Sequence, residues 1–296
     1  MSGQPKAGAA AGRRAQVDHC DGYSQLRGCD VVVITAGAKQ KPGEPRTELV
    51  GRNMSVLNSV MEGLLPCRPD TVFVIVSNPV DILTAEASGR TLSRHGGPPP
   101  AAPRRWRHAH PRRRAQIHAR WGAHVQRSNI IGSGTYLDSQ RLRVALAKRL
   151  GVAVNSVHAY VVGEHGDSQV FARSISHVGG CTINQLGIPE AELADMEKSA
   201  RTKAYSIIER TGATCHGIGA CVAEICEAIV LDKREIFPIS TYVEEFDAYL
   251  GWPTVVGALG AARTLPVVLL PEERECVMRS ASAMRSVRAS LSAGSN

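Results

Sequence analysis

Short apolar runs alternate with longer amphipathic stretches along most of the chain, a pattern typical of alternating strands and helices. Residues 31–34 and 72–76 are continuous apolar runs, which predict strands buried on both faces of a parallel sheet. Residues 47–65 between them have helical spacing and follow a polar loop with two prolines. We therefore expect a strand–helix–strand unit with parallel strands and a right-handed connection.

The second half of the chain continues the mixed pattern. It predicts helices at 138–150, about 189–211, about 214–231 and 271–290, and strands at 157–162, near 236–243 and near 254–256. Residues 1–20 are rich in Ala, Gly and basic residues without periodicity, so we expect them to be disordered. The fold class predicted from these patterns is α/β.

Residues 85–128 interrupt this pattern. They contain three consecutive prolines, five histidines and ten arginines against a single acidic residue, Glu86, whereas the whole chain carries a net charge of only +8. We interpret the segment as a disordered insertion, such as a translated intron or a shifted reading frame. The alternative is nucleic-acid binding, with the arginines contacting phosphates and Trp106 and Trp121 stacking on bases.

The remaining composition narrows the class of protein. The eight cysteines include no CxxC pair, which indicates reduced thiols in a cytoplasmic protein and no metal site. The longest apolar runs are strand-sized, far short of the roughly 20 residues of a membrane span. The N-terminus has no apolar segment of the secretory kind, so we expect no signal peptide and no membrane association.

A histidine between two glycines follows the strand-like run 157–162, in the block GEHGDS at 163–168. Alone, such a histidine is more often a hydrogen-bonded structural residue than a proton donor. Three further blocks precede it in order: GAKQKPGEPR at 37–46, SNPVD at 77–81 and IGSGTYLDSQR at 131–141. Together the four blocks resemble the L-lactate dehydrogenase family, within the lactate/malate dehydrogenases.

The resemblance implies the domain organisation. Residues 21–131 correspond to a partial dinucleotide-binding domain that is truncated at the N-terminus and interrupted by the insertion. Residues 132–296 correspond to the substrate and catalytic domain. The implied architecture is an incomplete Rossmann-type parallel sheet plus an α+β lactate/malate dehydrogenase C-terminal domain.

The same resemblance assigns the catalytic residues. His165 matches the proton donor and acceptor, and Asp138 matches the carboxylate that orients the imidazole and favours its protonated form. Arg141 lies three residues after Asp138, on the same helical face, and matches the guanidinium that binds the substrate carboxylate in a two-pronged pair. Arg46 matches the arginine of a mobile loop that closes over the substrate.

Substrate choice and cofactor contacts also follow from the resemblance. Gln40 matches the residue that discriminates between substrates, where malate dehydrogenases carry arginine, so pyruvate and lactate are favoured over malate. Thr214 matches a small residue of the substrate pocket, and Asn78 an asparagine near substrate and nicotinamide whose bond to Pro79 is expected to be cis. The residues that match contacts to NAD are Gly37, Ala38, Val76, Ser77, Asn78 and Ser133.

Two further implications concern regulation and assembly. Arg143 and His158 match positions that bind fructose 1,6-bisphosphate in bacterial members of the family. The alternative for both is an exposed basic residue without an effector. A homotetramer is implied by the resemblance alone.

One feature of the family is missing. A dinucleotide-binding domain opens with a strand, a Gly-x-Gly-x-x-Gly turn and a helix that binds the pyrophosphate, and no such arrangement occurs in the sequence. The leading hypothesis is an NAD-dependent L-lactate dehydrogenase that transfers hydride between NADH and pyruvate. The alternative is a catalytically impaired relative that acts only as a binding or assembly partner.

Overall fold

The computed structural model describes residues 19–38, 46–64, 67–93 and 126–293. Several predictions from sequence lie outside these ranges: the disorder of residues 1–18, the role of Gln40, and most of the Arg-rich segment. Arg46 begins the first long helix, but its side chain lies outside the described atoms.

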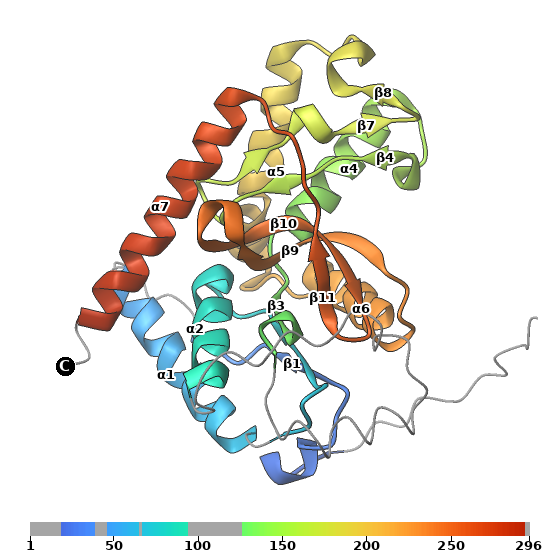
Figure 1. The fold of residues 1–296 in the computed structure, drawn as a ribbon. Coiled ribbons are helices and arrows are strands. Elements are labelled where there is room, and N and C mark those ends of the chain that lie inside the picture. The colour runs from blue at the N-terminus through green and yellow to red at the C-terminus, as the bar shows by residue number, and fades with distance from the viewer. Residues whose placement is uncertain (1–18, 39–45, 65–66, 94–125, 294–296) are drawn as a thin grey trace, which may run out of the picture.

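A six-stranded sheet in the order β1–β2–β3–β9–β10–β11 forms the centre of the molecule (Figure 1). The strands β1 (Val31–Ile34), β2 (Val72–Ile75) and β3 (Ile130–Gly132) are parallel to one another. β9 (Glu235–Val243), β10 (Ala248–Gly257) and β11 (Gly260–Thr264) continue the sheet in antiparallel fashion. The predicted strand–helix–strand unit is therefore confirmed, and it forms one edge of a larger mixed sheet.

Helices cover both faces of the parallel strands. Helices α1 (Arg46–Leu64) and α2 (Val80–Ser93) pack side chains such as Leu57 and Leu83 against Phe73 and Ile75 of β2. Helix α6 (His216–Val230) covers the opposite face through Ile225 and its neighbours. Both apolar faces of β2 are thereby removed from water, as the continuous apolar run of its sequence requires.

β1 is less buried than its sequence predicts. Val31 and Val32 are half-buried and Val33 is 37% exposed, although a strand buried on both faces was expected. The reason is its place at the edge of the sheet, because no other strand among the described residues pairs with its outer side. The prediction of a strand is correct, and the prediction of its burial is wrong.

The expected insertion begins later than the sequence suggests. Helix α2 continues through residues 85–93, which were assigned to the insertion, and it buries Ala85, Ala87 and Ser88. At the other end, Arg127 and Ser128 form a short 3-10 helix, η3 (Arg127–Asn129), that leads directly into β3. The composition changes at residue 85, but small residues there serve the packing of α2 against the sheet.

The C-terminal half packs two further layers onto the sheet. Helix α4 (Tyr136–Leu150) packs against α5 (Glu190–Thr211) and against short strands, two of which, β4 (Val157–His158) and β5 (Val161–Val162), occupy the predicted strand 157–162. β4 pairs with β7 (His177–Val178), which pairs with β8 (Cys181–Thr182), and β5 pairs with β6 (Val170–Phe171). Helix α7 (Pro271–Ala293) crosses β10 and reaches α2 (Figure 1). Short 3-10 helices complete the chain: η1 (Tyr23–Leu26), η4 (Val154–Ser156), η5 (Arg173–Ile175), η6 (Ile183–Leu186) and η7 (Glu244–Phe246).

β10 (Ala248–Gly257) is much longer than the predicted strand at 254–256 and includes Gly251 and Pro253. In the structure Pro253 lies opposite Pro238 of β9. Gly251 exchanges two backbone hydrogen bonds with Gly163, and a Cβ atom on Gly251 would lie 2.3 Å from Thr135 Oγ1. Glycine is required here because the side chain of Thr135 lies close to the backbone of β10, and not because the chain turns.

We expect Gly251→Ala to destabilise the protein by about 1–3 kcal/mol, because the new methyl group would displace Thr135 from the carbonyl it binds. Urea denaturation followed by circular dichroism measures the change. The matched control is Gly219→Ala in α6, where no atom lies near the new methyl group; it should gain up to about 1 kcal/mol. Equal stability of Gly251→Ala and wild type would refute the steric argument.

Candidate active site

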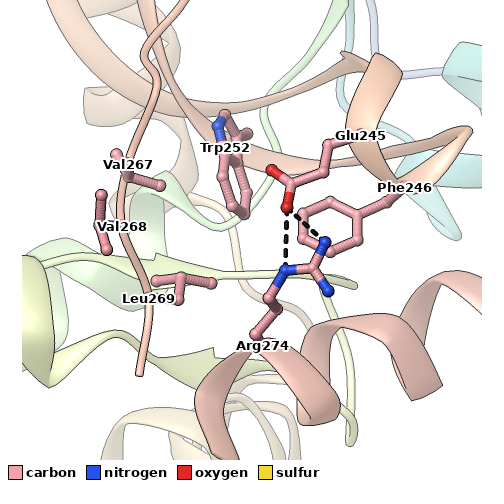
Figure 2. A pocket seen from close by; sticks show the side chains of 7 residues that line it. All are labelled: Glu245, Phe246, Trp252, Val267, Val268, Leu269 and Arg274. Atoms are coloured by element: carbon pink, nitrogen blue, oxygen red, sulfur yellow. Dashed lines mark hydrogen bonds and ion pairs between the residues drawn. The ribbon is translucent and has the colours of Figure 1, made fainter. Parts of the chain in front are cut away.

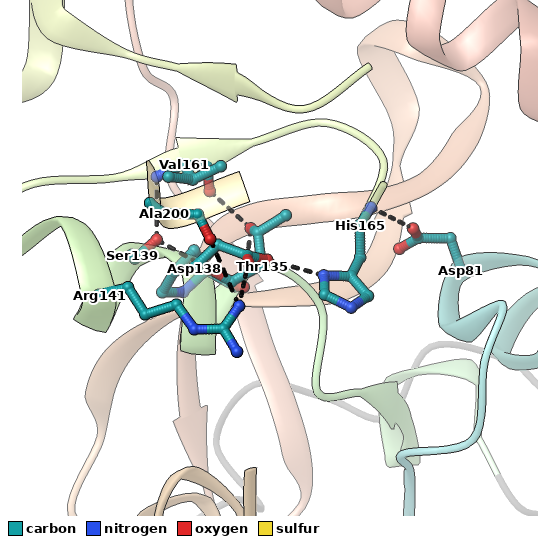
Figure 3. A network of polar contacts seen from close by, with 9 residues as sticks. Asp81, Thr135, Asp138, Ser139, Arg141, Val161, His165 and Ala200 are labelled. Carbon is teal, nitrogen blue, oxygen red and sulfur yellow. Dashed lines mark hydrogen bonds and ion pairs between the residues drawn. The ribbon is translucent and has the colours of Figure 1, made fainter. Parts of the chain in front are cut away.

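Two hydroxyl side chains bind the start of α4 to β5, the strand that precedes His165. Thr135 Oγ1 donates a hydrogen bond to the carbonyl oxygen of Val161 at 2.5 Å. Ser139 Oγ accepts from the N–H of Val161 at 2.9 Å and donates to the carbonyl oxygen of Thr135. All three residues are buried, so the relative position of α4 and the His165 loop is fixed by bonds shielded from water (Figure 3).

This arrangement brings Asp138 and His165 together. Asp138 is 2% exposed, and its Oδ2 lies 2.7 Å from Nδ1 of His165. An ionised carboxylate can only accept hydrogen bonds, so Nδ1 of His165 carries the shared proton and Nε2 faces away from Asp138. Among the described residues Nε2 has no hydrogen-bond partner. An imidazole held in this way can donate or accept a proton through Nε2.

Arg141 extends the same group of side chains. It lies one helical turn after Asp138 on α4 and is 15% exposed. Its Nη1 is 3.3 Å from Asp138 Oδ1 and donates to the carbonyl oxygen of Ala200 on α5 at 3.4 Å. Within the described part of the chain, Nε and Nη2 have no protein partner. The guanidinium therefore keeps one edge for an external anion.

The charges around His165 favour its protonated form. Burial alone lowers the pKa of His165, but the charge and hydrogen bond of Asp138, together with the charge of Asp81, outweigh burial and raise the pKa above its usual value. Arg141 opposes this change. The imidazole is 26% exposed and so remains accessible to a ligand.

The loop around His165 is held by residues to which the sequence assigned no role in positioning it. Gly163 has φ +89°, a conformation that favours glycine, and it pairs with Gly251. The N–H of Glu164 donates to Ser280 Oγ of α7 at 2.9 Å, and the N–H of His165 donates to Asp81 Oδ2 at 2.8 Å. Asp81 belongs to the SNPVD block, and its place in that block was the one available signal.

A second group of predicted residues meets at the carboxyl ends of β1 and β2. Asn53 of α1 links them: its Oδ1 accepts from the N–H of Ala38 at 2.6 Å, and its Nδ2 donates to the carbonyl oxygen of Asn78 at 2.7 Å. The peptide bond between Asn78 and Pro79 is cis, which confirms that prediction. Asn53 was missed from the sequence alone, although its spacing from Val50 and Leu57 places it on the apolar face of the predicted helix, where a polar residue is a signal of a buried hydrogen-bonding role.

Gly37, Ser77, Val76 and Ser133 lie at the same sheet edge. Ser77 Oγ donates to the carbonyl oxygen of Ala36 at 2.6 Å, and a Cβ atom on Gly37 would lie 3.3 Å from Ser77 Cβ. The N–H of Val76 donates to the carbonyl oxygen of Ile34, and the N–H of Ser133 to that of Ile75. The structure thus brings all six predicted cofactor-contact residues to one edge, where Gly37 and Asn78 are exposed.

The other predicted residues, Thr214 and Arg143, have fewer contacts that link them to the His165 site. Thr214 is half-buried between α5 and α6, and the start of α6 lies near α4, since a Cβ atom on Gly217 would lie 3.2 Å from Leu137 Cδ1. Arg143 points away from Arg141: its Nε donates to the carbonyl oxygen of Ala159.

His158 is the exposed residue of β4, and its ring stacks on the ring of His177 with 4.8 Å between the two centroids. Partial burial, and then the charges of His177 and Arg143, lower the pKa of His158. A neutral imidazole is a weaker partner for an anion than a charged one. Arg143 and His158 therefore remain a predicted effector site only.

The described residues hold one cavity that is separate from this site. It has a volume of about 190 Å³ and shares no lining residue with the His165 site (Figure 2). Its apolar walls are capped by the ion pair between Arg274 and Glu245. The described ranges contain no group of three or more His, Cys, Asp or Glu side chains placed to hold a metal ion. Likewise, none of the helices described is long and apolar enough to cross a membrane.

Comparison with known families gives two matches. A model described as lactate/malate dehydrogenase, NAD binding domain, matches residues 7–95, and one described as lactate/malate dehydrogenase, alpha/beta C-terminal domain, matches residues 135–292. The first match begins at residue 7, whereas the start of the resembling domain was expected from the sequence at residue 21. The two matches are separated by a stretch that contains most of the Arg-rich segment.

Individual relatives agree with these models. The chain is 41% identical over 263 residues to L-lactate dehydrogenase A of Rhizopus oryzae, covering 87% of this chain and 71% of the relative. It is 39% identical over 267 residues to an L-lactate dehydrogenase of Synechococcus sp. (strain JA-3-3Ab), covering 88% and 76%. A solved structure of a minor L-lactate dehydrogenase from Enterococcus mundtii has a TM-score of 0.75 at 29% identity, covering 90% of this chain and 78% of that one.

Proposed function

This chain belongs to the lactate/malate dehydrogenase family, and from that premise we propose that it transfers hydride between NADH and pyruvate, forming L-lactate and NAD+, and catalyses the reverse reaction. The chain is an NAD-dependent oxidoreductase of the lactate dehydrogenase type. The observation that carries the more specific proposal is the 2.7 Å contact between Asp138 and His165 with Arg141 one helical turn away.

Each side chain of the site has a separate role in the reaction of pyruvate. Arg141 binds the substrate carboxylate with the free edge of its guanidinium. His165 donates the proton from Nε2 to the carbonyl oxygen as negative charge develops there, and in the reverse direction it accepts the proton of the lactate hydroxyl. Asp138 keeps the imidazole in the required tautomer and stabilises its charged form. The nicotinamide, when bound, supplies or accepts the hydride.

The residues at the sheet edge fit the nicotinamide end of NAD. Gly37, Ala38, Asn78 and Ser133 present small side chains, an amide and a hydroxyl where β1, β2 and β3 end, the place at which open α/β sheets bind dinucleotides. For the pyrophosphate of NAD no binding residues of this kind are found among the described residues, since no glycine-rich turn between a strand and a helix precedes β1 there.

Several finer assignments belong to the same proposal. Gln40 selects pyruvate over a dicarboxylic substrate, Thr214 forms a wall of the substrate pocket, and Arg46 closes over the bound substrate. Arg143 and His158 bind fructose 1,6-bisphosphate. The active form is a homotetramer located in the cytoplasm, and its partners are small molecules.

A titration of the purified protein with NADH, followed by pyruvate in the same cuvette, tests the proposal. We expect saturable quenching of protein or NADH fluorescence, and NADH oxidation that depends on pyruvate. Oxaloacetate in place of pyruvate is the control for substrate choice and should react more slowly. Cofactor binding without turnover on either substrate would contradict the proposed reaction.

A second candidate function follows from the exposed edge of β1 and the unsupported pyrophosphate end. In this case the chain is a non-catalytic relative that acts as a binding or assembly partner. The titration separates the two candidates, because an assembly partner shows no saturable NADH binding up to millimolar concentration. Co-purification with an active family member would then support the second candidate.

A further inference from the structure

Asp81 connects the two halves of the active site. It is the second residue of α2, which begins directly after the cis Asn78–Pro79 bond. Its carboxylate is 2% exposed, and Oδ2 accepts the backbone N–H of His165 (Figure 3). One carboxylate therefore links the strand end that carries Asn78 to the loop that carries His165.

The hydrogen bond from Asp81 completes a three-point attachment of this loop. Successive backbone N–H groups of Gly163, Glu164 and His165 donate to β10, to α7 and to α2 respectively. The first acceptor is a carbonyl oxygen and the second is the hydroxyl of Ser280. The third acceptor, Asp81, is the one of the three that can carry a charge.

A charged acceptor is not needed to hold a backbone N–H. A serine or asparagine could accept the same hydrogen bond without the free-energy cost of burying an ion. Burial raises the pKa of Asp81 to about 6, although the Ser240 hydroxyl and the N–H and charge of His165 favour the ionised form. The cost is real, because Asp81 Oδ1 forms no well-aligned hydrogen bond with any described residue.

The charge has a consequence for the imidazole. Asp81 and Asp138 lie on either side of His165 in Figure 3, and the negative charge of each raises the pKa of His165. Because burial raises the pKa of Asp81 only to about 6, while the pKa of His165 lies above its own usual value, Asp81 carries negative charge over the range in which His165 loses its proton.

We propose that Asp81 is a positioning residue of the active site, whose carboxylate both holds the His165 loop through its backbone N–H and stabilises the positively charged imidazole. The inference rests on the proposed function for its effect on turnover. Its effect on His165 does not depend on turnover.

Other ionisable groups surround the same carboxylate and define the control. Glu164 lies on the His165 loop, and the groups that line a small cavity with Asp81 are Asp247 after η7, Tyr249 on β10, and Arg285 and Arg288 on α7. Asp247 loses the same charge when changed to Asn, but its carboxylate accepts from Tyr242 and makes no contact with His165. Asp247→Asn is thus the matched control for Asp81→Asn.

The test is a pH titration of the full chain, labelled at the histidine rings, by NMR without cofactor. Asp81→Asn keeps an oxygen that can accept the His165 N–H but removes the charge, so the pKa of His165 should fall by about 1 unit or more. Asp247→Asn should leave it near the wild-type value. An unchanged pKa in Asp81→Asn, or an equal fall in both variants, would overturn the proposal.

A further variant guards against misfolding. If the NMR spectrum of Asp81→Asn shows an unfolded chain, Asp81→Ser removes the same charge and offers a hydroxyl acceptor, and the same fall in pKa is expected. Asp81→Glu keeps the charge and should keep the raised pKa of His165. A fall in Asp81→Glu as large as in the neutral variants would mean that the carboxylate acts through packing alone.

Kinetics then extends the test to the reaction. In Asp81→Asn the decline of kcat/KM for pyruvate reduction with rising pH should move to lower pH, in step with the NMR value. At a pH above the shifted pKa this gives about a tenfold loss for each unit. If the wild type shows no turnover, the proposed function fails, while the NMR result still decides the role of Asp81.

Discussion

Replacement of His165 by asparagine should lower kcat/KM for pyruvate reduction by about 10²–10⁴-fold, which is the usual contribution of a positioned acid or base. Asparagine keeps the size and a hydrogen-bonding atom for Asp138 but cannot deliver a proton. The wild-type rate should decline as the pH rises through the pKa of His165, since only the protonated imidazole donates. Because that pKa is raised, the decline should occur above the usual value near 6.5.

The pH profile of the variant provides the sharper measurement. His165→Asn should lose this decline while keeping NADH binding. His19, which is fully exposed and pairs with Asp21 near the N-terminal end of the described chain, supplies the control His19→Asn, with wild-type kinetics. A decline of the same midpoint in His165→Asn would show that another group carries the proton.

The same shift predicts a change in stability with pH. A histidine whose pKa is higher in the folded state than in the unfolded state contributes stability below the unfolded pKa, and this contribution is lost as the pH rises through the folded value. The free energy of unfolding of the wild type should therefore fall relative to His165→Asn above pH 6.5. Denaturation at several pH values checks the sign.

The sequence predicted that Asp138 and His165 act together, but not which residues hold them in contact. Asp138 and His165 could be assigned because both belong to recognisable blocks, and the i, i+3 spacing placed Arg141 beside Asp138. Their contact across 27 positions depends on Thr135 and Ser139, whose hydroxyls bind a neighbouring strand. Hydroxyl residues at the start of a helix normally indicate caps, so their long-range role is visible only once the chain is folded.

The roles of Asp81 and Gly251 likewise could not be predicted from the sequence. An acidic residue in the first turn of a helix is ordinarily explained by the helix dipole, so nothing in the sequence pointed from Asp81 to His165. The sequence predicts a strand only near 254–256, whereas the structure places Gly251 inside a longer β10, where its missing side chain leaves room for Thr135. Local sequence patterns predict local structure well. The roles of Asp81 and Gly251, however, are set by contacts with segments that are distant in the sequence.

The position of β1 at the edge of the sheet could be predicted only in part. The missing glycine-rich unit was evident from the sequence, yet the run 31–34 still suggested burial on both faces. Burial depends on the neighbouring strand as well as on the strand itself, and the described chain provides a neighbour on one side of β1. The 37% exposure of Val33 is the physical result.

Replacement of Arg141 by lysine should raise the KM for pyruvate and lower kcat/KM by roughly 10- to 150-fold, which corresponds to about 1.5–3 kcal/mol for a lost charge-assisted hydrogen bond. Lysine keeps the positive charge but cannot present two parallel N–H groups to a carboxylate. It also cannot bind Asp138 and Ala200 while facing a substrate, as the guanidinium does. Steady-state kinetics with varied pyruvate measures the effect.

Two comparisons make this result specific to the carboxylate. Arg149→Lys changes the same residue type two turns further along α4, where the side chain forms an exposed ion pair with Glu192, and it should leave KM near the wild-type value. Methyl pyruvate lacks the carboxylate charge, so the wild type should prefer pyruvate strongly and Arg141→Lys should narrow that preference. An equal loss on both substrates would mean that Arg141 supports the position of Asp138 and not the binding of the anion.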